Sequence, residues 1–207
     1  MPPKNIVTKE QIIDAALEQT RKGGIDSVTA RNIARRLGVS THPIFSYFDS
    51  IEALKTEVFR AARLVYKEYI LRGFEEKIPF LGIGHQYMRF AAEEKELYKL
   101  IFLTPGYSGK GGSGETFDYS FGLIKDAVMR IYNMDEKKAE CYYRILWLAS
   151  SGLATMTVTG SSDLSDERQS AIMTQVSLAV CKAIKEIPGF EDGDFDREKL
   201  FTELVSL

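Results

Sequence analysis

The chain has 207 residues, of which 44% are apolar, and its formal net charge is −2 at pH 7. These values predict a packed globular protein of one or two domains, and the near-neutral charge alone gives no sign of a nucleic-acid partner. The charge is divided unevenly, because residues 1–65 carry a net charge of +3 and residues 66–207 a net charge of −5. The amino-terminal third is therefore the part that would attract phosphate groups.

Cysteine content and hydropathy exclude other classes of protein. Cys141 and Cys181 lie 40 residues apart within apolar helical patterns, which indicates core thiols and neither a disulfide framework nor a metal cluster. The amino terminus lacks the apolar core of a signal peptide. The most apolar stretch, residues 141–158, contains Arg144 and several serine, threonine and glycine residues, so it suits a buried bundle or interface helix better than a bilayer span. We therefore expect a cytoplasmic protein without a membrane partner.

The first predicted element is an amphipathic helix that Thr8 caps. Residues 1–7 precede it, either as an arm whose Lys4 reaches a phosphate or as a disordered terminus. Thr8 and Gln11 fit a capping box, in which each side chain accepts a hydrogen bond from the other residue's backbone amide. The glycine pair at 23–24 ends the helix. Its apolar face is expected to brace the next two helices, and it consists of Ile12, Ile13, Ala16 and Leu17.

Two short helices joined by a tight turn are predicted over residues 29–48. Thr29 can cap the first helix, and Gly38 can end it in the left-handed conformation that glycine adopts without strain. Either Ser40 or Thr41 can cap the second helix, since both starts keep the following proline within the first turn. The residues expected to face inward are Ile33, Ala34, Leu37, Ile44 and Phe48. This layout is a helix-turn-helix, which either places its second helix in the DNA major groove or serves contacts between proteins.

The amino-terminal third resembles a known family through three successive segments, EQIIDAALEQTRKGG, DSVTARNIARRLGVSTHPIFSYF and DSIEALKTEVF. They are similar to the DNA-binding domain of the TetR family of bacterial transcriptional regulators, whose remaining helical part binds an effector and dimerises. The resemblance covers residues 8–62. It implies that Thr41, His42, Pro43 and Ser46 face bases and that Phe45 and Tyr47 lie close to bases or backbone. The full set of residues expected to contact DNA is Thr29, Arg31, Ser40, Thr41, His42, Pro43, Phe45, Ser46, Tyr47 and Lys55.

The sequence departs from the family pattern at two positions. Phe45 stands where the family usually has a tyrosine whose hydroxyl binds phosphate, and Ile51 stands where a phosphate-binding lysine is common. Each lost anchor is worth about 1 kcal/mol as a hydrogen bond, and the lysine also releases a counterion. We expect a shallow salt dependence of DNA binding, or compensation by Arg31, Arg35, Lys55 or the amino-terminal arm.

A fourth helix is predicted from Ile51 to Arg72, capped by Ser50. Its length would let it extend from the helix-turn-helix into the next domain and act as a lever that changes the tilt of the DNA-binding part. The predicted buried stripe consists of Leu54, Val58, Ala61, Ala62 and Val65.

The remaining chain is predicted to be helical. A connection bracketed by Gly73 and Pro79 leads to two helices within Phe80 to Phe102, and further helices are predicted over residues 115–133, 136–158, 166–186 and 196–207. The glycine-rich stretch 104–115 fails the phosphate-loop pattern, because a glycine follows Gly-Lys and a helix precedes the stretch, so a loop is expected.

The segments ELYKLIF and WLASSG resemble motifs of one group of TetR carboxy-terminal domains. In this family the last two long helices form the dimer interface, and small residues from Ala149 to Ala154 would permit close contact.

Aromatic residues are abundant after residue 65 and could line an effector pocket between helices, although core packing is the alternative for each. The predicted ligand-binding residues are Tyr66, Tyr87, Phe90, Phe102, Phe121, Tyr143 and Trp147. Only two histidines are present, His42 in the helix-turn-helix and His85 in an apolar helix, where we expect a hydrogen-bonded structural role. No catalytic or metal motif is found, so neither enzymatic activity nor a cofactor is expected.

The sequence therefore predicts an all-α protein, with a three-helix DNA-binding domain at residues 1–52 and a helical bundle for effector binding and dimerisation at residues 53–207. The expected function is a ligand-responsive regulator, most often a repressor in this family. It would bind a palindromic operator as a homodimer and be released by a small apolar or aromatic effector. The alternative is a helical small-molecule-binding or enzymatic protein whose amino-terminal helices contact other proteins.

Overall fold

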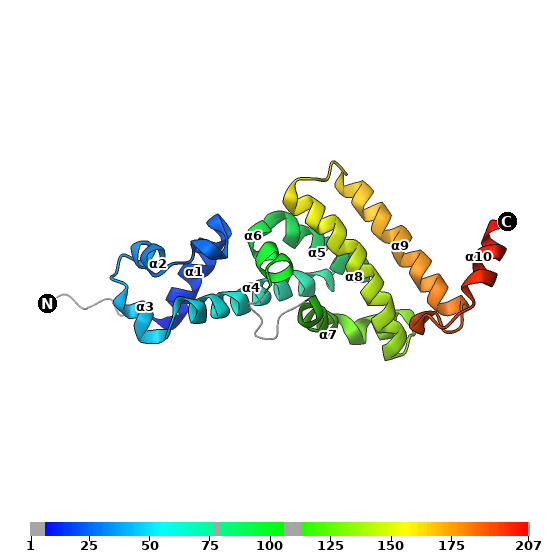
Figure 1. Cartoon of the computed structure of the whole chain (residues 1–207), viewed down its shortest axis with the longest axis horizontal. Helices are drawn as coiled ribbons and strands as arrows, with labels where there is room; N and C mark the ends of the chain where they lie inside the picture. The colour runs from blue at the N-terminus through cyan, green and yellow to red at the C-terminus, as the bar shows by residue number, and fades with distance from the viewer. Residues whose placement is uncertain (1–6, 77–78, 106–112, 207) are drawn as a thin grey trace. The chain divides into compact units, whose positions relative to one another are not determined.

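The computed structural model describes residues 7–76, 79–105 and 113–206, and within these ranges every regular element is a helix (Figure 1), which confirms the all-α prediction. The helices are α1 (Lys9–Gly23), η1 (Ile25–Ser27), α2 (Ala30–Leu37), α3 (His42–Tyr47), α4 (Ile51–Gly73), α5 (Pro79–Glu93), α6 (Lys95–Tyr98), the π-helical turn η2 (Lys99–Leu103), α7 (Ser113–Tyr132), α8 (Glu136–Thr159), α9 (Asp166–Glu186), η3 (Phe190–Asp192) and α10 (Arg197–Val205). Lys4 and residues 106–112 of the glycine-rich stretch lie outside the described ranges.

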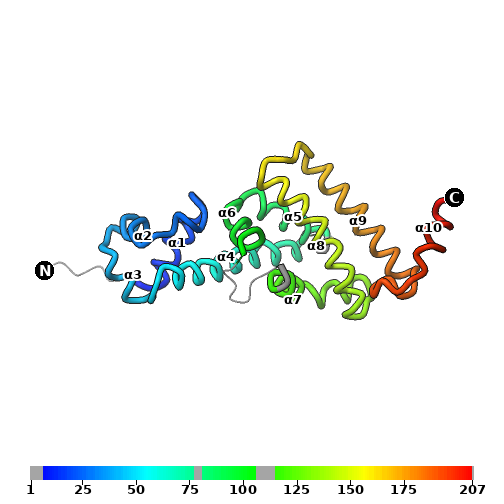
Figure 2. Tube along the Cα trace, viewed as in Figure 1, coloured from blue at the N-terminus to red at the C-terminus, as the bar shows by residue number. Residues whose placement is uncertain are grey.

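The chain forms two compact units. The first contains residues 1–119 and 154–162, and the second contains residues 120–153 and 163–207. This division by packing does not coincide with the predicted boundary after residue 52, because α4 crosses that boundary and packs against both α1 and α5. The path of α4 beside these two helices can be followed in Figure 2. The division into DNA-binding and effector-binding parts stays a prediction about function.

Helix α1 begins and ends as predicted. The Thr8 Oγ1 atom accepts a hydrogen bond from the Gln11 amide at 3.2 Å, and the Gln11 Oε1 atom accepts one from the Thr8 amide at 3.0 Å. The helix stops at Gly24, whose φ of 73° lies in the region that favours glycine. The 3₁₀ turn that follows was not predicted from the sequence. It is stabilised by the Ser27 hydroxyl, which donates to the Gly24 carbonyl at 2.7 Å.

The helix-turn-helix has the predicted turn, and its second helix has one of the two predicted starts. Gly38 adopts φ 67° and ψ 31° at the end of α2, and the Val39 amide donates to the Ala34 carbonyl at 3.0 Å. Helix α3 starts at His42 with Thr41 as its cap residue. The Thr41 side chain makes no cap hydrogen bond, because the second helical residue is a proline without an amide and the amide of the third, Ile44, donates to the Thr41 carbonyl at 3.2 Å. Four of the five residues predicted to face inward are buried, and the fifth, Leu37, is half-buried.

Helix α4 is buried along one row of side chains. The Ser50 hydroxyl caps it by accepting the Ala53 amide hydrogen bond at 3.1 Å. The predicted stripe was partly wrong, because Ala61 and Val65 are half-buried. Residues four positions apart lie in one row along the helix surface, whereas the predicted stripe mixed several spacings. Further side chains near the end of α4 are also buried. The buried residues are Leu54, Val58, Phe59, Ala62, Tyr66, Tyr69, Ile70 and Gly73.

The second compact unit has its own aromatic core. The Tyr142 ring is fully buried 4.7 Å from the Tyr132 ring, and its hydroxyl lies 2.6 Å from Ser177 Oγ on α9. Burial raises the pKa of the Tyr142 hydroxyl well above its usual value, so it stays protonated. Cys141 and Cys181 are both free and half-buried.

The carboxy-terminal helix was predicted as a short element over residues 196–207. Helix α10 does form behind its Asp196 cap, whose carboxylate accepts the Lys199 amide hydrogen bond at 2.9 Å. It buries none of its residues, however, and Phe201 is 66% exposed. An apolar helical pattern alone does not specify a surface that covers the helix.

Helices α4 and α5 cross so closely that side chains are excluded at the contact. A Cβ atom at Gly73 would lie 2.6 Å from the Ile83 Cα atom, and one at Gly82 would lie 2.3 Å from the Gly73 carbonyl oxygen. Both distances are too short for non-bonded atoms. Glycine is therefore required at these two helical positions, despite its poor helix propensity.

We predict that Gly82→Ala destabilises the protein, whereas Gly84→Ala in the same helix stabilises it or leaves it unchanged. Nothing lies within 4 Å of a Cβ atom at Gly84, so that variant gains up to about 1 kcal/mol from helix propensity. Chemical denaturation monitored by circular dichroism measures both effects. Equal stability of the two variants would contradict the close crossing.

Candidate nucleic-acid interface

The outward surface of α3 is the candidate interface. Ile44 and Phe48, one helical turn apart, are buried and anchor the helix. The rest of the segment faces outward, with Phe45 50% and Tyr47 44% exposed. The other exposed side chains are Thr41, His42 and Ser46, while Pro43 is half-buried. The structure thus exposes all the residues predicted on α3 except Pro43, and their contacts with DNA stay predictions.

Positive charge beside α3 comes from α2. Arg31 and Arg35 are both exposed, and the Arg35 Nη2 atom donates to the Asn32 Oδ1 atom of the same helix at 3.1 Å. Thr29 is exposed at the start of α2, where its hydroxyl oxygen accepts the Asn32 amide hydrogen bond at 3.2 Å. The turn residue Ser40 is exposed as well. These positions suit phosphate contacts, which need charge and hydrogen-bond donors without base specificity.

Lys55 is less available for a DNA contact than the sequence predicted. Its side chain is only 12% exposed, and its Nζ atom lies 3.0 Å from the Glu52 carboxylate on the same helix. A phosphate contact would require this ion pair to rearrange. Lys9 was not among the residues predicted to contact DNA, and its Nζ atom lies 5.6 Å from the centre of the Phe48 ring at the end of α3. The same Nζ atom is 4.0 Å from the Glu57 carboxylate on α4.

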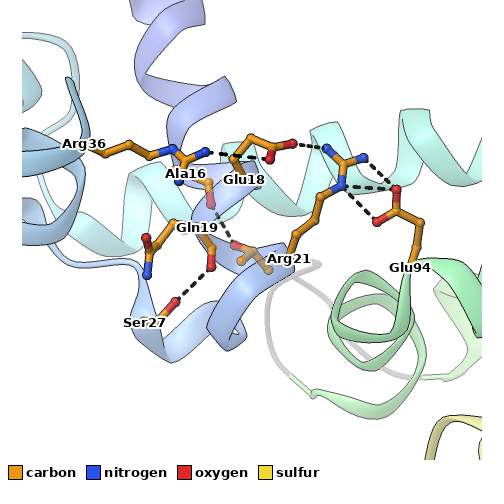
Figure 3. A network of polar contacts seen from close by, with 8 residues as sticks. Ala16, Glu18, Gln19, Arg21, Ser27, Arg36 and Glu94 are labelled. Atoms are coloured by element: carbon orange, nitrogen blue, oxygen red, sulfur yellow. Dashed lines mark hydrogen bonds and ion pairs between the residues drawn. The ribbon is translucent and has the colours of Figure 1, made fainter.

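A network of ion pairs connects the helix-turn-helix to the turn between α5 and α6 (Figure 3). The Arg21 guanidinium binds both carboxylate oxygens of Glu94, with Nε to Oε2 at 2.9 Å and Nη2 to Oε1 at 2.8 Å. Glu18 contacts Arg21 and, at 3.7 Å, the Arg36 guanidinium on α2. The Glu94 side chain is 16% exposed and that of Arg21 is 30% exposed. Bidentate pairs of this kind fix orientation as well as distance.

A cleft of about 550 Å³ adjoins this network. Its lining is predominantly charged, unlike the apolar effector pocket that was predicted, and consists of Arg21, Lys22, Ala92, Glu93, Glu94, Lys95 and Glu96. Close by, the Tyr69 hydroxyl donates to the Glu93 carboxylate at 2.8 Å. The hydrogen bonds from Arg89 and Tyr69 hold the pKa of the Glu93 carboxyl below its usual value, so this carboxylate stays charged near neutral pH.

Four of the predicted ligand-binding residues lie together in the first compact unit. Tyr66 packs edge-to-face against Phe90 and Phe102, with ring centroids 5.4 and 5.3 Å apart, and Tyr87 lies 5.6 Å from Phe102. Two residues outside the predicted set complete this group. We call it the aromatic cluster, and it consists of Tyr66, Tyr69, Tyr87, Phe90, Tyr98 and Phe102.

The aromatic cluster contains a short series of hydroxyl groups. The Tyr98 hydroxyl lies 3.3 Å from that of Tyr87 and 3.4 Å from Thr155 Oγ1. Such groups could orient a ligand among the rings. Phe121 and Tyr143 stack on each other at 5.5 Å in the second compact unit, where Trp147 is half-buried. The predicted set is therefore divided between the two units.

The remaining histidine does not lie in an apolar environment. His85 is exposed on α5, and its Nδ1 atom is 3.2 Å from the Glu76 carboxylate. The described residues contain no group of histidine, cysteine, aspartate and glutamate side chains that could hold a metal ion. Across the same residues, every helix is too short or too polar to cross a bilayer.

Comparison with known proteins gives two family matches. Residues 12–58 match the family described as bacterial regulatory proteins of the tetR family. Residues 80–178 match the tetracyclin repressor-like carboxy-terminal domain. Together the two matches cover most of the chain, from the first buried residue of α1 to the middle of α9. No curated protein matches it.

Two solved structures have a similar fold. One is a proposed transcriptional regulator from Pseudomonas aeruginosa PAO1, with a TM-score of 0.63 and 15% identity over 86% of this chain and 92% of the other. The second is a proposed TetR-family transcriptional regulator from Vibrio parahaemolyticus, with a TM-score of 0.50 and 18% identity over 83% of this chain and 97% of the other. At these identities the likeness shows the fold.

We predict that Glu94→Gln lowers the free energy of unfolding by about 1–2 kcal/mol, because the partly buried Arg21 loses a charged bidentate partner. The control is Lys182→Ala, which removes a pair whose side chains are 72% and 61% exposed and should change stability by less than about 0.5 kcal/mol. Urea unfolding measures both variants. An effect of Glu94→Gln no larger than that of the control would mean that the Arg21 contact does not stabilise the fold.

Proposed function

Because the chain belongs to the TetR family of transcriptional regulators, whose members bind DNA and are not enzymes, we propose that it represses transcription by binding a palindromic operator as a homodimer. A small apolar or aromatic effector would release it. The observation that carries the proposal is the outward surface of α3, where Thr41, His42, Phe45, Ser46 and Tyr47 are exposed above a buried anchor. A helix presented in this way fits the major groove.

We propose a dimer because the outward surface of α3, which we call the reading surface, is small. Helix α3 has six residues, which cover too few base pairs for a specific site, and two-fold pairing doubles the contacts. Exposed apolar side chains on α8 and α9 support an interface there. Leu148 is 60% exposed next to exposed Gly152 on α8, and Leu178 is 66% exposed on α9. Leucine side chains beside small residues allow helices of two subunits to approach closely.

The aromatic cluster is the proposed effector site, and α5 would carry the signal from it. Phe90 belongs to the cluster, and one helical turn later the Glu94 amide donates to the Phe90 carbonyl at 2.8 Å. A ligand that displaces Phe90 would therefore move Glu94 and disturb its bond with Arg21 on α1. The DNA-binding part, proposed as residues 1–52, would then change its orientation on α4.

We expect His42→Ala and Tyr47→Ala each to weaken operator binding about tenfold, as the loss of one good base or backbone contact would. Thermal stability should be nearly unchanged, because both side chains are exposed. Fluorescence anisotropy, with a duplex selected by the protein from a randomised pool, measures binding. Phe201→Ala on α10 is the control and should bind like the unchanged protein. Full affinity in both α3 variants would remove α3 from the interface.

Placing a carboxylate in the proposed dimer interface should produce monomers. We predict that Leu148→Glu and Leu178→Glu each raise the dimer dissociation constant by a hundredfold or more, since an unpaired charge would be buried between subunits. Leu64→Glu is the control, because Leu64 is 59% exposed on α4 outside this interface. Sedimentation equilibrium measures the association. If both variants remain as dimeric as the control, the subunits associate through another surface.

A further inference from the structure

The reading surface of α3 lacks the side chains that usually recognise guanine. No lysine or arginine occurs between Val39 and Ile51, although three arginines lie on the preceding helix. The commonest specific contact in the major groove is a bidentate bond from arginine or lysine to guanine O6 and N7. Helix α3 cannot make it. Arg31 and Arg35 of α2 suit phosphate contacts, which supply affinity without sequence preference. The sequence preference therefore depends on α3.

Phe45 gives this surface an apolar element. Its ring is 50% exposed, although an aromatic ring of this size is normally covered. Thr41 lies one turn earlier, so its side chain is on the same face of the helix as the ring. At the base edges of the major groove, the C5-methyl group of thymine is the apolar feature that distinguishes a base pair. A phenyl ring has neither a donor nor an acceptor, and it would therefore favour a thymine.

The hydroxyl groups of Ser46 and Thr41 add hydrogen-bonding capacity beside the Phe45 ring. The Ser46 hydroxyl donates to the His42 carbonyl at 3.0 Å, which leaves its oxygen as an acceptor. Thr41 makes no cap hydrogen bond with its side chain, so its hydroxyl can turn toward a base. An accepting oxygen next to an apolar ring suits the adenine amino group of one base pair and the thymine methyl group of a neighbour.

We propose that Phe45, with Thr41 beside it, determines operator specificity by contacting thymine C5-methyl groups in each half-site. This rests on the proposed DNA-binding function and adds the group on DNA that is read. The half-site positions under Phe45 are A·T pairs whose preference depends on the methyl group itself. Replacing thymine by uracil there removes the contact and leaves every hydrogen bond between the bases in place.

The experiment starts from duplexes that the protein selects from a randomised pool at physiological salt. In the recovered operator, each half-site thymine is replaced in turn by deoxyuridine, and affinities are measured by fluorescence anisotropy. At one or two positions affinity falls about fourfold, the equivalent of one buried methyl group. Deoxyuridine in the spacer between half-sites is the matched control and leaves affinity unchanged.

A second arm assigns the methyl group to its residue. Phe45→Ala binds the thymine operator more weakly and no longer distinguishes thymine from uracil, whereas Tyr47→Ala binds more weakly and retains the full difference. This is a double-mutant cycle between a protein ring and a DNA methyl group. Both variants are checked for folding by circular dichroism, and neither substitution changes a buried side chain.

The outcomes separate the inference from the function on which it rests. Sequence-specific binding that is insensitive to uracil at every half-site position overturns methyl readout and leaves the regulator in place. A uracil effect that persists in Phe45→Ala overturns the role of Phe45. Failure of the folded dimer to enrich any sequence overturns the DNA-binding proposal together with this inference.

Discussion

The burial of one face of α4 is the constraint on which the first compact unit depends. Leu54 and Val58 near its start are fully buried, and α1 packs on this helix. Tyr66 further along the same row, and Tyr69 beside that row, enter the aromatic cluster. Because one rigid helix supplies both sets of side chains, a change in the packing of the rings alters the support of the helix-turn-helix. The crossing of Gly73 and Gly82 holds α5 against the far end of α4 without intervening side chains.

The bond between Arg21 and Glu94 adds a second connection between the same two regions. It joins α1 to the residue that caps α6, and Glu18 extends it to Arg36 on α2. A salt bridge of this exposure contributes modestly to stability. Its geometry has a larger consequence, because a planar guanidinium held by both carboxylate oxygens does not tolerate a sideways shift of the turn between α5 and α6. The pair therefore couples the position of α5 to that of α1, and through Glu18 to α2.

Local features of the sequence predicted local features of the structure. The capping box at Thr8 and the left-handed Gly38 were confirmed, because each depends on residues within a few positions of one another. The matches to the TetR family confirmed the assignment that the motif had indicated. For α3, the start at Thr41 became clear only from the backbone, since two caps were compatible with the same proline.

Features that depend on distant residues could not be predicted. Arg21 and Glu94 are 73 positions apart, and their pairing follows from the packing of α1 on α6. Four predicted pocket residues gather in one cluster, while Phe121 and Tyr143 pair in the other unit, although both groups have the same composition. Lys55 was selected for its position in the motif, and its contact with Glu52 depends on rotamers that sequence does not specify. The exposure of α10, likewise, could not be predicted from its apolar pattern.

We infer that α1 to α3 and the aromatic cluster belong to one cooperative unit. Native-state hydrogen exchange of Phe90→Ala tests it most directly, because this substitution opens a cavity in the cluster and leaves the helix-turn-helix residues intact. We expect amides in α1 and α2 to lose protection together with those of α5. If only the amides around α5 exchange faster, while α1 and α2 keep the protection of the unchanged protein, the two regions are energetically independent and the claim is contradicted.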